Sequence, residues 1–564
     1  MKILGISAFY HDSAAALFID GELVSAIEEE RFSRVKHDNL FPFKAIQYCL
    51  DSVGLAIGDI DAVAYYEKPL RKFERLLETF VVTYPFALRP FLQAIPDWLG
   101  QKISVEDIIR KKVGFTKQIY FVPNHLSHAA AAYYSSAFDT AAILTVDGVG
   151  EYQTTALWKG EKGTLLPLAS IDFPHSIGLL YSTFTAYLGF KVNEDEYKVM
   201  GLSAYGSPEY VKEIYRLIDI NPDGSFRLDM RYFSYRESFR MFNNAFISLF
   251  GSPRTPGEKV EKRHRDIAAS IQFVVEELLF TMLNHLYALT KSPHLCMGGG
   301  VALNALANGK IYTRTPFKKV HILGAAGDSG AAIGAALYVQ RQVSRDTAQQ
   351  QIKTLYLGSA YSNESIEALL RCYPTLTHRK YDNESELLRS VAAMLSKGKT
   401  IGWFWGRAEY GPRALGARSI LSKPGPRVMK DIMNKIKRRE EFRPFAGSIL
   451  QEHVHEYFHT PERNYYSPFM NVCLVVREDK RKELAAIVHA DDTCRIQTVN
   501  KDNGRYYRLI KEYYRFTGTP CILNTSFNVM GEPIVEHPRQ AIEDYLRSKM
   551  DILVLNDILC VKND

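Results

Sequence analysis

Two histidines and two aspartates in the first half of the chain have the side chains and the surroundings of metal ligands. They are His125 and His128, three residues apart, Asp147 before a glycine turn, and Asp328 within the turn 327–330. Imidazole nitrogens and carboxylate oxygens suit borderline metals such as zinc or iron, provided that three or four of them converge. A structural role for each residue alone, as a hydrogen-bonded histidine or an Asp-Gly turn, is the alternative that the sequence leaves open.

Glycines accompany these candidate ligands in two segments. They are Gly148 and Gly150 in one segment and Gly298, Gly299 and Gly300 in the other. A backbone without Cβ atoms lets its amide groups approach a phosphate or a nucleotide sugar closely. Together with the turn 327–330, the two segments predict a nucleotide-binding cleft.

A second group of candidates is basic and lies more than two hundred residues further on. Its members are Arg407, Arg413, Arg418, Lys437, Arg439, Arg443 and, later, Arg495. Guanidinium groups bind phosphate or carboxylate through two parallel hydrogen bonds, and several of these arginines stand among Pro, Leu, Phe and Ala, where an unpaired charge is costly. Small polar residues that could hold a triphosphate or a carbamate follow a later strand: Asn524, Ser526 and Asn528. The basic residues could instead form a solvated helix face, and the small polar residues could instead cap the next helix.

The elements that must position these residues alternate between strands and helices. Strand-like runs are expected at 3–8, 14–25, 61–66, 118–122, 141–146 and 153–158, and again at 400–405, 470–476 and 551–555. Strand, glycine turn and helix in succession predict an α/β fold with ligand loops at strand ends. The polar segment 340–353 is the predicted linker, and the proline-broken region 69–100 is expected to be a lid, an acceptor-binding wall or surface decoration.

Length and composition limit the class of protein. A chain of 564 residues is too long for one core, so two to four domains are expected at roughly 100–200 residues each. The formal net charge of +7 is modest and favours phosphorylated small molecules over nucleic acid as partners. Seven scattered cysteines without a Cys-x-x-Cys pair, and an N-terminus that enters a strand directly, favour a reducing cytoplasm. Residues 80–99 are broken by prolines and arginine, so no membrane span is expected.

The order of several motifs resembles the NodU/CmcH O-carbamoyltransferases over essentially the whole chain. The segments are 11–15, 28–37, 125–131, 196–202, 298–304 and 406–419, the last of which contains the specific run Gly-Pro-Arg-Ala-Leu-Gly-Ala-Arg-Ser. The resemblance implies a two-lobed actin-like ATPase (ASKHA) domain similar to TsaD over 1–345, a linker over 346–364 and a YrdC-like domain over 365–564. It also implies that carbamoyl phosphate and ATP give carbamoyl-adenylate in the second domain, and that the first domain transfers the carbamoyl group to a hydroxyl.

The resemblance also assigns residues. His128, Asp147 and Asp328 match the family's metal ligands, for an iron-type divalent metal, and His11 matches a residue near the reacting group. Lys36 and Lys198 match lysines beside the nucleotide, and Gly298, Gly299, Gly300 and Asn304, in a matching segment, are expected to bind the cofactor. The carbamoyl-phosphate and ATP pocket is matched by Arg413, Arg418, Lys437, Arg443, Arg495, Ser526 and Asn528, with Mg²⁺ accompanying ATP.

One position departs from the family pattern. Relatives place a histidine four residues before His128, where this chain has Asn124. An amide oxygen is a harder and weaker ligand than imidazole. The departure leaves three alternatives. The site has a lower metal affinity, His125 takes the place of the missing histidine ligand, or the site binds a harder metal such as magnesium or manganese.

The leading hypothesis is therefore an ATP-dependent O-carbamoyltransferase with a hydroxylated small-molecule or sugar acceptor, with a homodimer left open as its assembly. A threonylcarbamoyl-type tRNA-modifying transferase is the alternative among enzymes, and it would require a basic RNA-binding surface. An actin-like nucleotide-binding chaperone or scaffold is the alternative from another class, in which the arginine cluster has no purpose.

Overall fold

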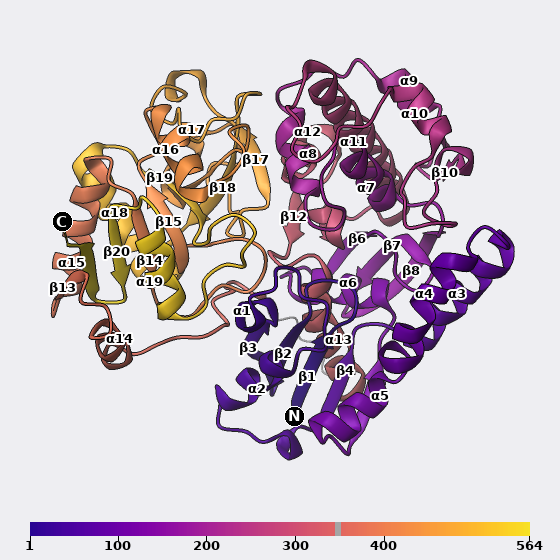
Figure 1. Cartoon of the computed structure of the whole chain (residues 1–564), viewed down its shortest axis with the longest axis horizontal. Coiled ribbons are helices and arrows are strands. Elements are labelled where there is room, and N and C mark those ends of the chain that lie inside the picture. Colours follow the sequence, from indigo (N-terminus) through magenta and orange to yellow (C-terminus); the bar gives the residue numbers. More distant parts are fainter. Residues whose placement is uncertain (345–350, 564) are drawn as a thin grey trace. The chain divides into compact units, whose positions relative to one another are not determined.

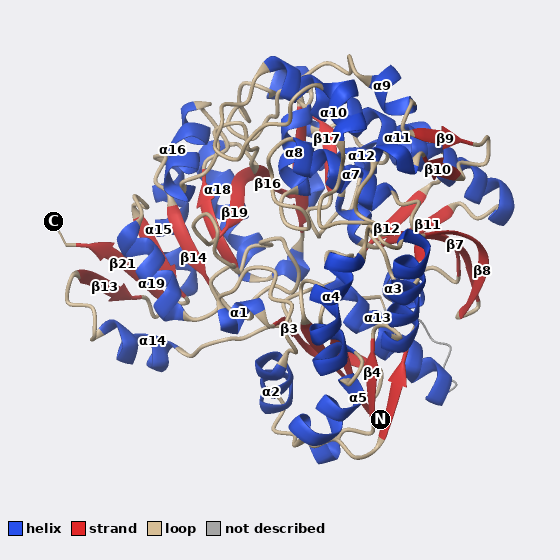
Figure 2. Ribbon diagram, turned by 45° about the vertical axis from the view of Figure 1, so that its right-hand side comes forward, coloured by secondary structure: helices blue, strands red, loops and turns tan. Residues whose placement is uncertain are grey.

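The computed structural model describes residues 1–344 and 351–563, and the chain divides into two compact units. The first unit comprises Met1–Ser25 and Asn39–Ile352, and the second comprises Ala26–Asp38 and Lys353–Asp564. Within the predicted linker 340–353, residues 345–350 lie outside the described residues, and residues 340–344 are the last turn of a helix. The segment 26–38, expected within the first domain, groups with the second unit. Figure 1 follows the chain through both units by colour, and Figure 2 shows helices and strands mixed in each.

Two five-stranded sheets with the same topology form the first unit. One has the order β3-β2-β1-β4-β5 and the other β12-β11-β6-β7-β8. In each, the central strand (β1 or β6) pairs antiparallel with the next strand along the chain and parallel with a later one on its other side. The repeated pattern is that of a two-lobed actin-like domain, so the predicted fold is confirmed. The strands are β1 (Lys2–Ser7), β2 (Ala14–Ile19), β3 (Glu22–Glu28), β4 (Ala62–Tyr65), β5 (Gln118–Phe121), β6 (Thr140–Val146), β7 (Gln153–Glu161), β8 (Thr164–Asp172), β11 (His294–Gly298) and β12 (Lys319–Ile322).

The predicted single strand 14–25 is instead the hairpin β2–β3. Asp20 and Gly21 form its turn with φ of 48° and 94°. Glycine adopts such positive φ readily and aspartate tolerates it better than most residues, so this pair can reverse the chain. The other predicted strands are confirmed to within a few residues.

Helix α13 (Asp328–Ser344) lies against both β1 and α6 (Asn124–Tyr134), and this packing depends on residues without large side chains. A Cβ atom on Gly5 of β1 would lie 2.0 Å from the carbonyl oxygen of Ala332, and one on Gly334 would lie 1.9 Å from that of Ser127. Only glycine permits such close approach of two backbones. The ends of α6 and α13 that carry His128 and Asp328 are thereby brought together.

Further helices of the first unit surround the two sheets. They are α2 (Phe43–Asp51), α3 (Pro69–Thr83), α4 (Leu88–Asp97), α5 (Val105–Asp107), α7 (Ile177–Tyr187), α8 (Glu196–Ser203), α9 (Val211–Tyr215), α10 (Asn244–Phe250), α11 (Lys262–Thr290) and α12 (Ala305–Arg314), with the short hairpin β9 (Ile218–Ile220) and β10 (Phe226–Leu228). No helix among the described residues is long and apolar enough to cross a membrane.

The second unit is built on a nine-stranded mixed sheet of order β13-β21-β20-β14-β15-β19-β16-β18-β17. Its core buries side chains of α15 and α18, such as Val391 and Leu509, against sheet residues such as Trp403 and Ile522. The strands are β13 (Leu376–Lys380), β14 (Ile401–Phe404), β15 (Arg418–Ser422), β16 (Ala446–Leu450), β17 (Val472–Val475), β18 (Thr493–Val499), β19 (Cys521–Ser526), β20 (Ile552–Leu555) and β21 (Ile558–Lys562). The helices are α1 (Glu30–Ser33), α14 (Asn363–Leu370), α15 (Glu384–Ser396), α16 (Val428–Lys437), α17 (Val454–Tyr457), α18 (Arg505–Thr517) and α19 (Pro538–Arg547).

Candidate active sites

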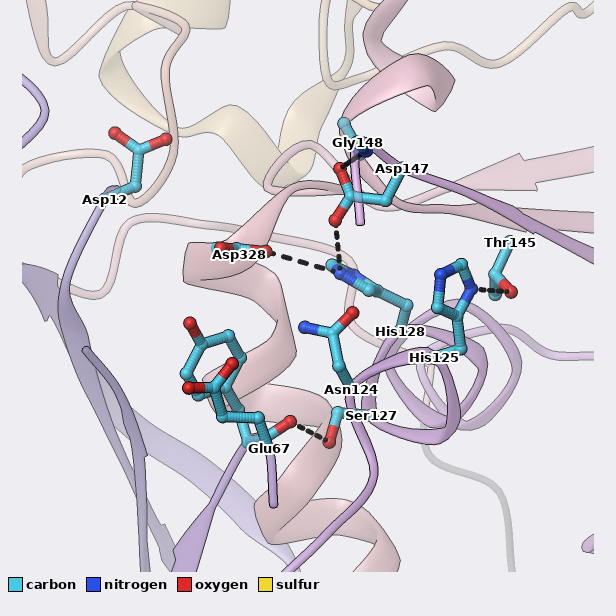
Figure 3. Close-up of polar contacts among 12 residues, drawn as sticks. Asp12, Glu67, Asn124, His125, Ser127, His128, Thr145, Asp147, Gly148 and Asp328 are labelled. Atoms are coloured by element: carbon cyan, nitrogen blue, oxygen red, sulfur yellow. Dashed lines mark hydrogen bonds and ion pairs between the residues drawn. The ribbon is translucent and has the colours of Figure 1, made fainter. Parts of the chain in front are cut away.

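His128, Asp147 and Asp328 meet in the interior of the first unit (Figure 3). His128 lies one turn into α6, Asp147 directly follows β6, and Asp328 is the first residue of α13. The Nε2 atom of His128 is 3.1 Å from Oδ2 of Asp147 and 3.4 Å from Oδ1 of Asp328, and all three side chains are buried. Their ligand atoms lie within 4.8 Å of one another.

Negative charge dominates this site. Burial alone would lower the pKa of His128, but the hydrogen bond to Asp147 and the charge of Asp328 raise it to about 9. Burial opposes ionisation of Asp147, yet its hydrogen bond to His128 and nearby imidazolium charge hold its pKa below the usual value. The amides of Gly148 and Gly300 also donate to Oδ1 of Asp147, at 2.8 and 3.3 Å. The pair therefore exists as imidazolium and carboxylate at neutral pH.

The three residues fit a divalent cation. One imidazole nitrogen and two carboxylate oxygens from three different segments converge, and these are atom types that bind divalent metals in proteins. Oδ1 of Asp328 is buried, and apart from its 3.4 Å ion-pair contact with His128 it makes no hydrogen bond to any described residue. A cation would replace the proton of His128 and satisfy this oxygen.

Asn124 and His125 occupy different surroundings. Nδ1 of His125 is 2.8 Å from Oγ1 of Thr145, and burial lowers its pKa to about 4, so this ring is neutral. Oδ1 of Asn124 is buried and has no hydrogen-bond partner among the described residues. Figure 3 shows the Asn124 amide beside His128, while His125 turns toward Thr145. Of the two, Asn124 is the residue placed to face the three-residue group.

His11 lies in the turn between β1 and β2. Its Nδ1 is 2.9 Å from Oδ2 of Asp12. Burial would lower its pKa, but the charges of Asp328, Asp12 and Asp147 together raise it to about 10. His11, which the family resemblance places near the reacting group, therefore interacts electrostatically with the buried carboxylates.

The predicted phosphate-binding glycines line the same site. A Cβ atom on Gly299, whose φ is 88°, would lie 2.2 Å from the carbonyl oxygen of Val146, and one on Gly298 would lie 2.8 Å from that of His128. A Cβ atom on Gly150 would lie 3.0 Å from Oδ1 of Asn124. These glycines therefore allow close packing against the protein's own backbone and side chains, while their predicted role in binding a phosphate stays a prediction.

Two other predicted nucleotide residues have protein partners. Asn304 caps α12 by accepting from the amide of Ala307, and its side chain exchanges two 3.0 Å hydrogen bonds with Gln272. Lys198 on α8 is buried and lies 3.1 Å from Asp195. These contacts order the helices near the site.

The second unit contains a group of cations that includes Lys36 from the segment 26–38. Nζ of the buried Lys437 donates to Oγ of Ser526 at 3.1 Å and to Oδ1 of Asn528. Burial lowers the pKa of Lys437 strongly, and the charges of Arg439, Arg443 and Lys36 lower it further. Such mutual repulsion favours binding of an anion.

Arg495 on β18 extends this group. Burial and the neighbouring charge of Arg443 lower its pKa, and its buried Nε makes no hydrogen bond to any described residue. Arg443 itself is 3.5 Å from Glu440, and Arg439 donates to Oδ1 of Asn434 at 2.8 Å. The nearby Asn524 belongs to a buried amide network with Ser448 and Gln497.

The guanidinium groups of Arg418 and Arg407 donate hydrogen bonds to carbonyl oxygens of the protein's own backbone. The Arg418 side chain is completely buried and donates to the carbonyl oxygens of residues 359, 405, 406 and 417 at 2.8–3.2 Å. Its guanidinium also lies 3.6 Å from the centre of the Phe404 ring. Arg407 donates to the carbonyls of residues 357 and 358. Both predicted ligand arginines therefore order the loop around Arg413, which is itself half-buried.

Three acidic and basic residues that sequence reasoning missed hold the same loop. The buried carboxylate of Glu409 accepts from the amides of residues 415, 417 and 418 at 2.7–3.1 Å. Glu28 accepts from the amide of Gly411, and Arg31 donates to its carbonyl at 2.8 Å. The motif 28–37 was a signal for Glu28 and Arg31, but nothing in the local sequence pointed to their partner 380 residues away.

Comparison with known proteins identifies the family. The model described as "Carbamoyltransferase N-terminus" matches residues 2–337, and "Carbamoyltransferase C-terminus" matches residues 392–562. An uncharacterized protein of Synechocystis is 44% identical over 99% of this chain and 96% of its own length. Nodulation protein NolNO of Sinorhizobium fredii is 36% identical over 99% of this chain and 80% of its own length.

The chain therefore belongs to the carbamoyltransferase family, and the enzyme class predicted from the motifs is confirmed. Among solved structures, HypF of T. kodakarensis matches 61% of this chain and 48% of its own with 12% identity and a TM-score of 0.34. A likeness this weak adds nothing to the assignment.

Proposed function

We propose that this carbamoyltransferase uses ATP to activate carbamate in the second unit and transfers the carbamoyl group to a hydroxyl of a small-molecule or sugar acceptor in the first. The observation that carries this proposal is the pairing, in one chain, of a cation group centred on Lys437 with a buried histidine–carboxylate group centred on His128. The first suits phosphates and the second suits acyl transfer.

Activation requires that phosphate charge be neutralised. In the proposed step, water hydrolyses carbamoyl phosphate to carbamate and inorganic phosphate. A carbamate oxygen then attacks the α-phosphorus of ATP, so that carbamoyl-adenylate forms and pyrophosphate leaves. Lys437, Arg443 and Arg495 are assigned to the phosphates because they repel one another when no anion is bound. Positioning and electrostatic stabilisation account for most of the catalysis of such phosphoryl chemistry.

Transfer forms a bond between the acceptor oxygen and the carbamoyl carbon, and AMP leaves. His128, Asp147 and Asp328 would hold a divalent metal, which supplies Lewis-acid polarisation of the carbonyl when bound. His11 is assigned to take the hydroxyl proton. Its pKa of about 10 follows from the carboxylates around it, so neutralisation of Asp147 and Asp328 would lower it toward the range of a base.

The test is carbamoyl-phosphate-dependent conversion of ATP to AMP and pyrophosphate. Lys437→Met should abolish it, whereas Lys435→Met, on the exposed face of the same helix, should not. Asp147→Asn should keep pyrophosphate release, with water consuming the intermediate, and lose carbamoylated product. Loss of both activities in a folded Asp147→Asn variant, or pyrophosphate release without carbamoyl phosphate, would refute the two-site assignment.

A further inference from the structure

Helix α3 presents basic side chains toward the transfer site of the first unit. Lys72 is buried, pairs with Glu67 at 2.5 Å, and places its Nζ 5.0 Å from the centre of the Tyr10 ring. Arg75 follows three residues later, so it lies on the same face of the helix. The carboxylate of Glu67 pairs with Lys72, and Arg75 has no such ion pair among the described residues.

The Arg75 guanidinium makes no hydrogen bond or ion pair with any residue that the structure describes, and its Nη1 is buried. The carboxylates of Glu67 and Glu151 act on it only through longer-range electrostatics. One face of its guanidinium lies over the Phe173 ring, 5.0 Å from the ring centre. Arg75 as a whole is half-buried, but a guanidinium nitrogen that is buried without an acceptor is costly to the fold. Such an arrangement is maintained where an anion completes it.

Hydrogen bonds join this helix to the residues of the transfer site. The backbone amide of Lys68, just before α3, donates to Glu151 at 2.7 Å, and the same carboxylate accepts from the amide of Asn124 at 3.0 Å. Asn124 begins α6, which carries His128 one turn later. Glu151 therefore holds the start of α3 beside the start of α6.

Tyr10 interacts electrostatically with both Arg75 and the buried carboxylates. Its ring is 4.6 Å from that of His11, and its hydroxyl would be 3.2 Å from a Cβ atom on Gly148. Burial raises the pKa of the phenol, Asp147 and Asp328 raise it further, and Arg75 lowers it. Tyr10 is therefore protonated, within electrostatic reach of both groups, and able to donate a hydrogen bond.

We propose that Arg75 binds an anionic group, a carboxylate or a phosphate, on the hydroxylated acceptor, with Tyr10 as the adjacent hydrogen-bond donor. This inference rests on the proposed function only in naming the ligand as the acceptor. The guanidinium fork would bind the anion through two hydrogen bonds while Phe173 covers its face, and the acceptor hydroxyl would extend toward His11.

Calorimetric titration with three matched probes tests this proposal: glucuronate, glucose 1-phosphate and glucose. We expect the wild-type protein to bind glucuronate or glucose 1-phosphate at least about 10-fold more tightly than glucose, the scale of one charge-assisted hydrogen bond. Arg75→Gln should lose this preference, and Arg71→Gln, an exposed arginine on the same helix, should keep it. Arg75→Lys keeps the charge without the fork and should lie between them. The two charged probes distinguish carboxylate from phosphate.

Equal binding of all three probes by the wild-type protein, or an undiminished preference in Arg75→Gln, would overturn the proposal. If Arg75→Gln does not fold, full wild-type preference in Arg75→Lys has the same consequence. The titration contains neither ATP nor carbamoyl phosphate. A failure to bind the charged probes would therefore contradict the role of Arg75 without contradicting the proposed transfer reaction. A failure to cleave ATP would contradict the proposed function without contradicting the binding preference.

Discussion

Replacing Asp147 by asparagine should destabilise the metal-free protein in a pH-dependent way. The pKa of His128 is raised from 6.5 to about 9, which corresponds to about 3 kcal/mol of preference for its charged form. Because two carboxylates share this interaction, removal of one should cost about 1.5 kcal/mol. A raised histidine pKa contributes stability that is complete below pH 6.5 and is lost as the pH rises through about 9.

The assay is urea unfolding followed by circular dichroism, with a chelator present, at pH 6 and pH 10. We expect Asp147→Asn to lower the free energy of unfolding at pH 6. At pH 10 the His128 imidazole is mostly neutral and His11 is about half protonated, so the substitution should lower the free energy of unfolding much less than at pH 6. The control is Asp219→Asn, an exposed aspartate on β9. If Asp147→Asn lowered the free energy of unfolding equally at both pH values, charge pairing with His128 would not be the contribution of Asp147 to stability.

Three further substitutions test the second unit. Lys437→Met should weaken binding of inorganic phosphate about 10-fold. A bound anion raises the depressed pKa of Lys437, so the affinity of the wild-type protein for phosphate should fall as the pH rises. Calorimetry in buffers of different ionisation enthalpy should show proton uptake on binding that the variant lacks. Arg418→Lys should lower the stability of the unit by about 3 kcal/mol, since several buried carbonyls lose their donors, and unchanged urea unfolding would contradict that role. Arg413→Ala should keep the protein folded and abolish pyrophosphate release; release at the wild-type rate would remove Arg413 from the activation site.

Local sequence determined much of the first site. A three-residue spacing places His125 and His128 on one helix, an apolar strand ends just before Asp147, and a run of small residues after Asp328 predicts the helix that α13 forms. Backbone hydrogen bonding repeats over a few residues, so these elements follow from nearby side chains. The motif order was sufficient to predict the carbamoyltransferase family.

Only the tertiary structure decided which of these side chains meet. Asp328 comes within 3.4 Å of His128 because Gly334 lets α13 approach the backbone of α6, while His125, on the same helix, is held by Thr145 instead. The spacing of the two histidines contains no information about these distant partners.

The same distinction applies to the basic residues. Arg413 and Arg418 are alike in sequence, but the chain folds carbonyl oxygens around Arg418, and a buried guanidinium is satisfied by whichever acceptors surround it. Lys36 joins the second unit because Glu28 and Arg31 bind the backbone of Gly411, a contact across 380 residues. Residue type determined that these groups are cationic. Their roles depend on which acceptors the fold places beside them, and that is a property of long-range packing.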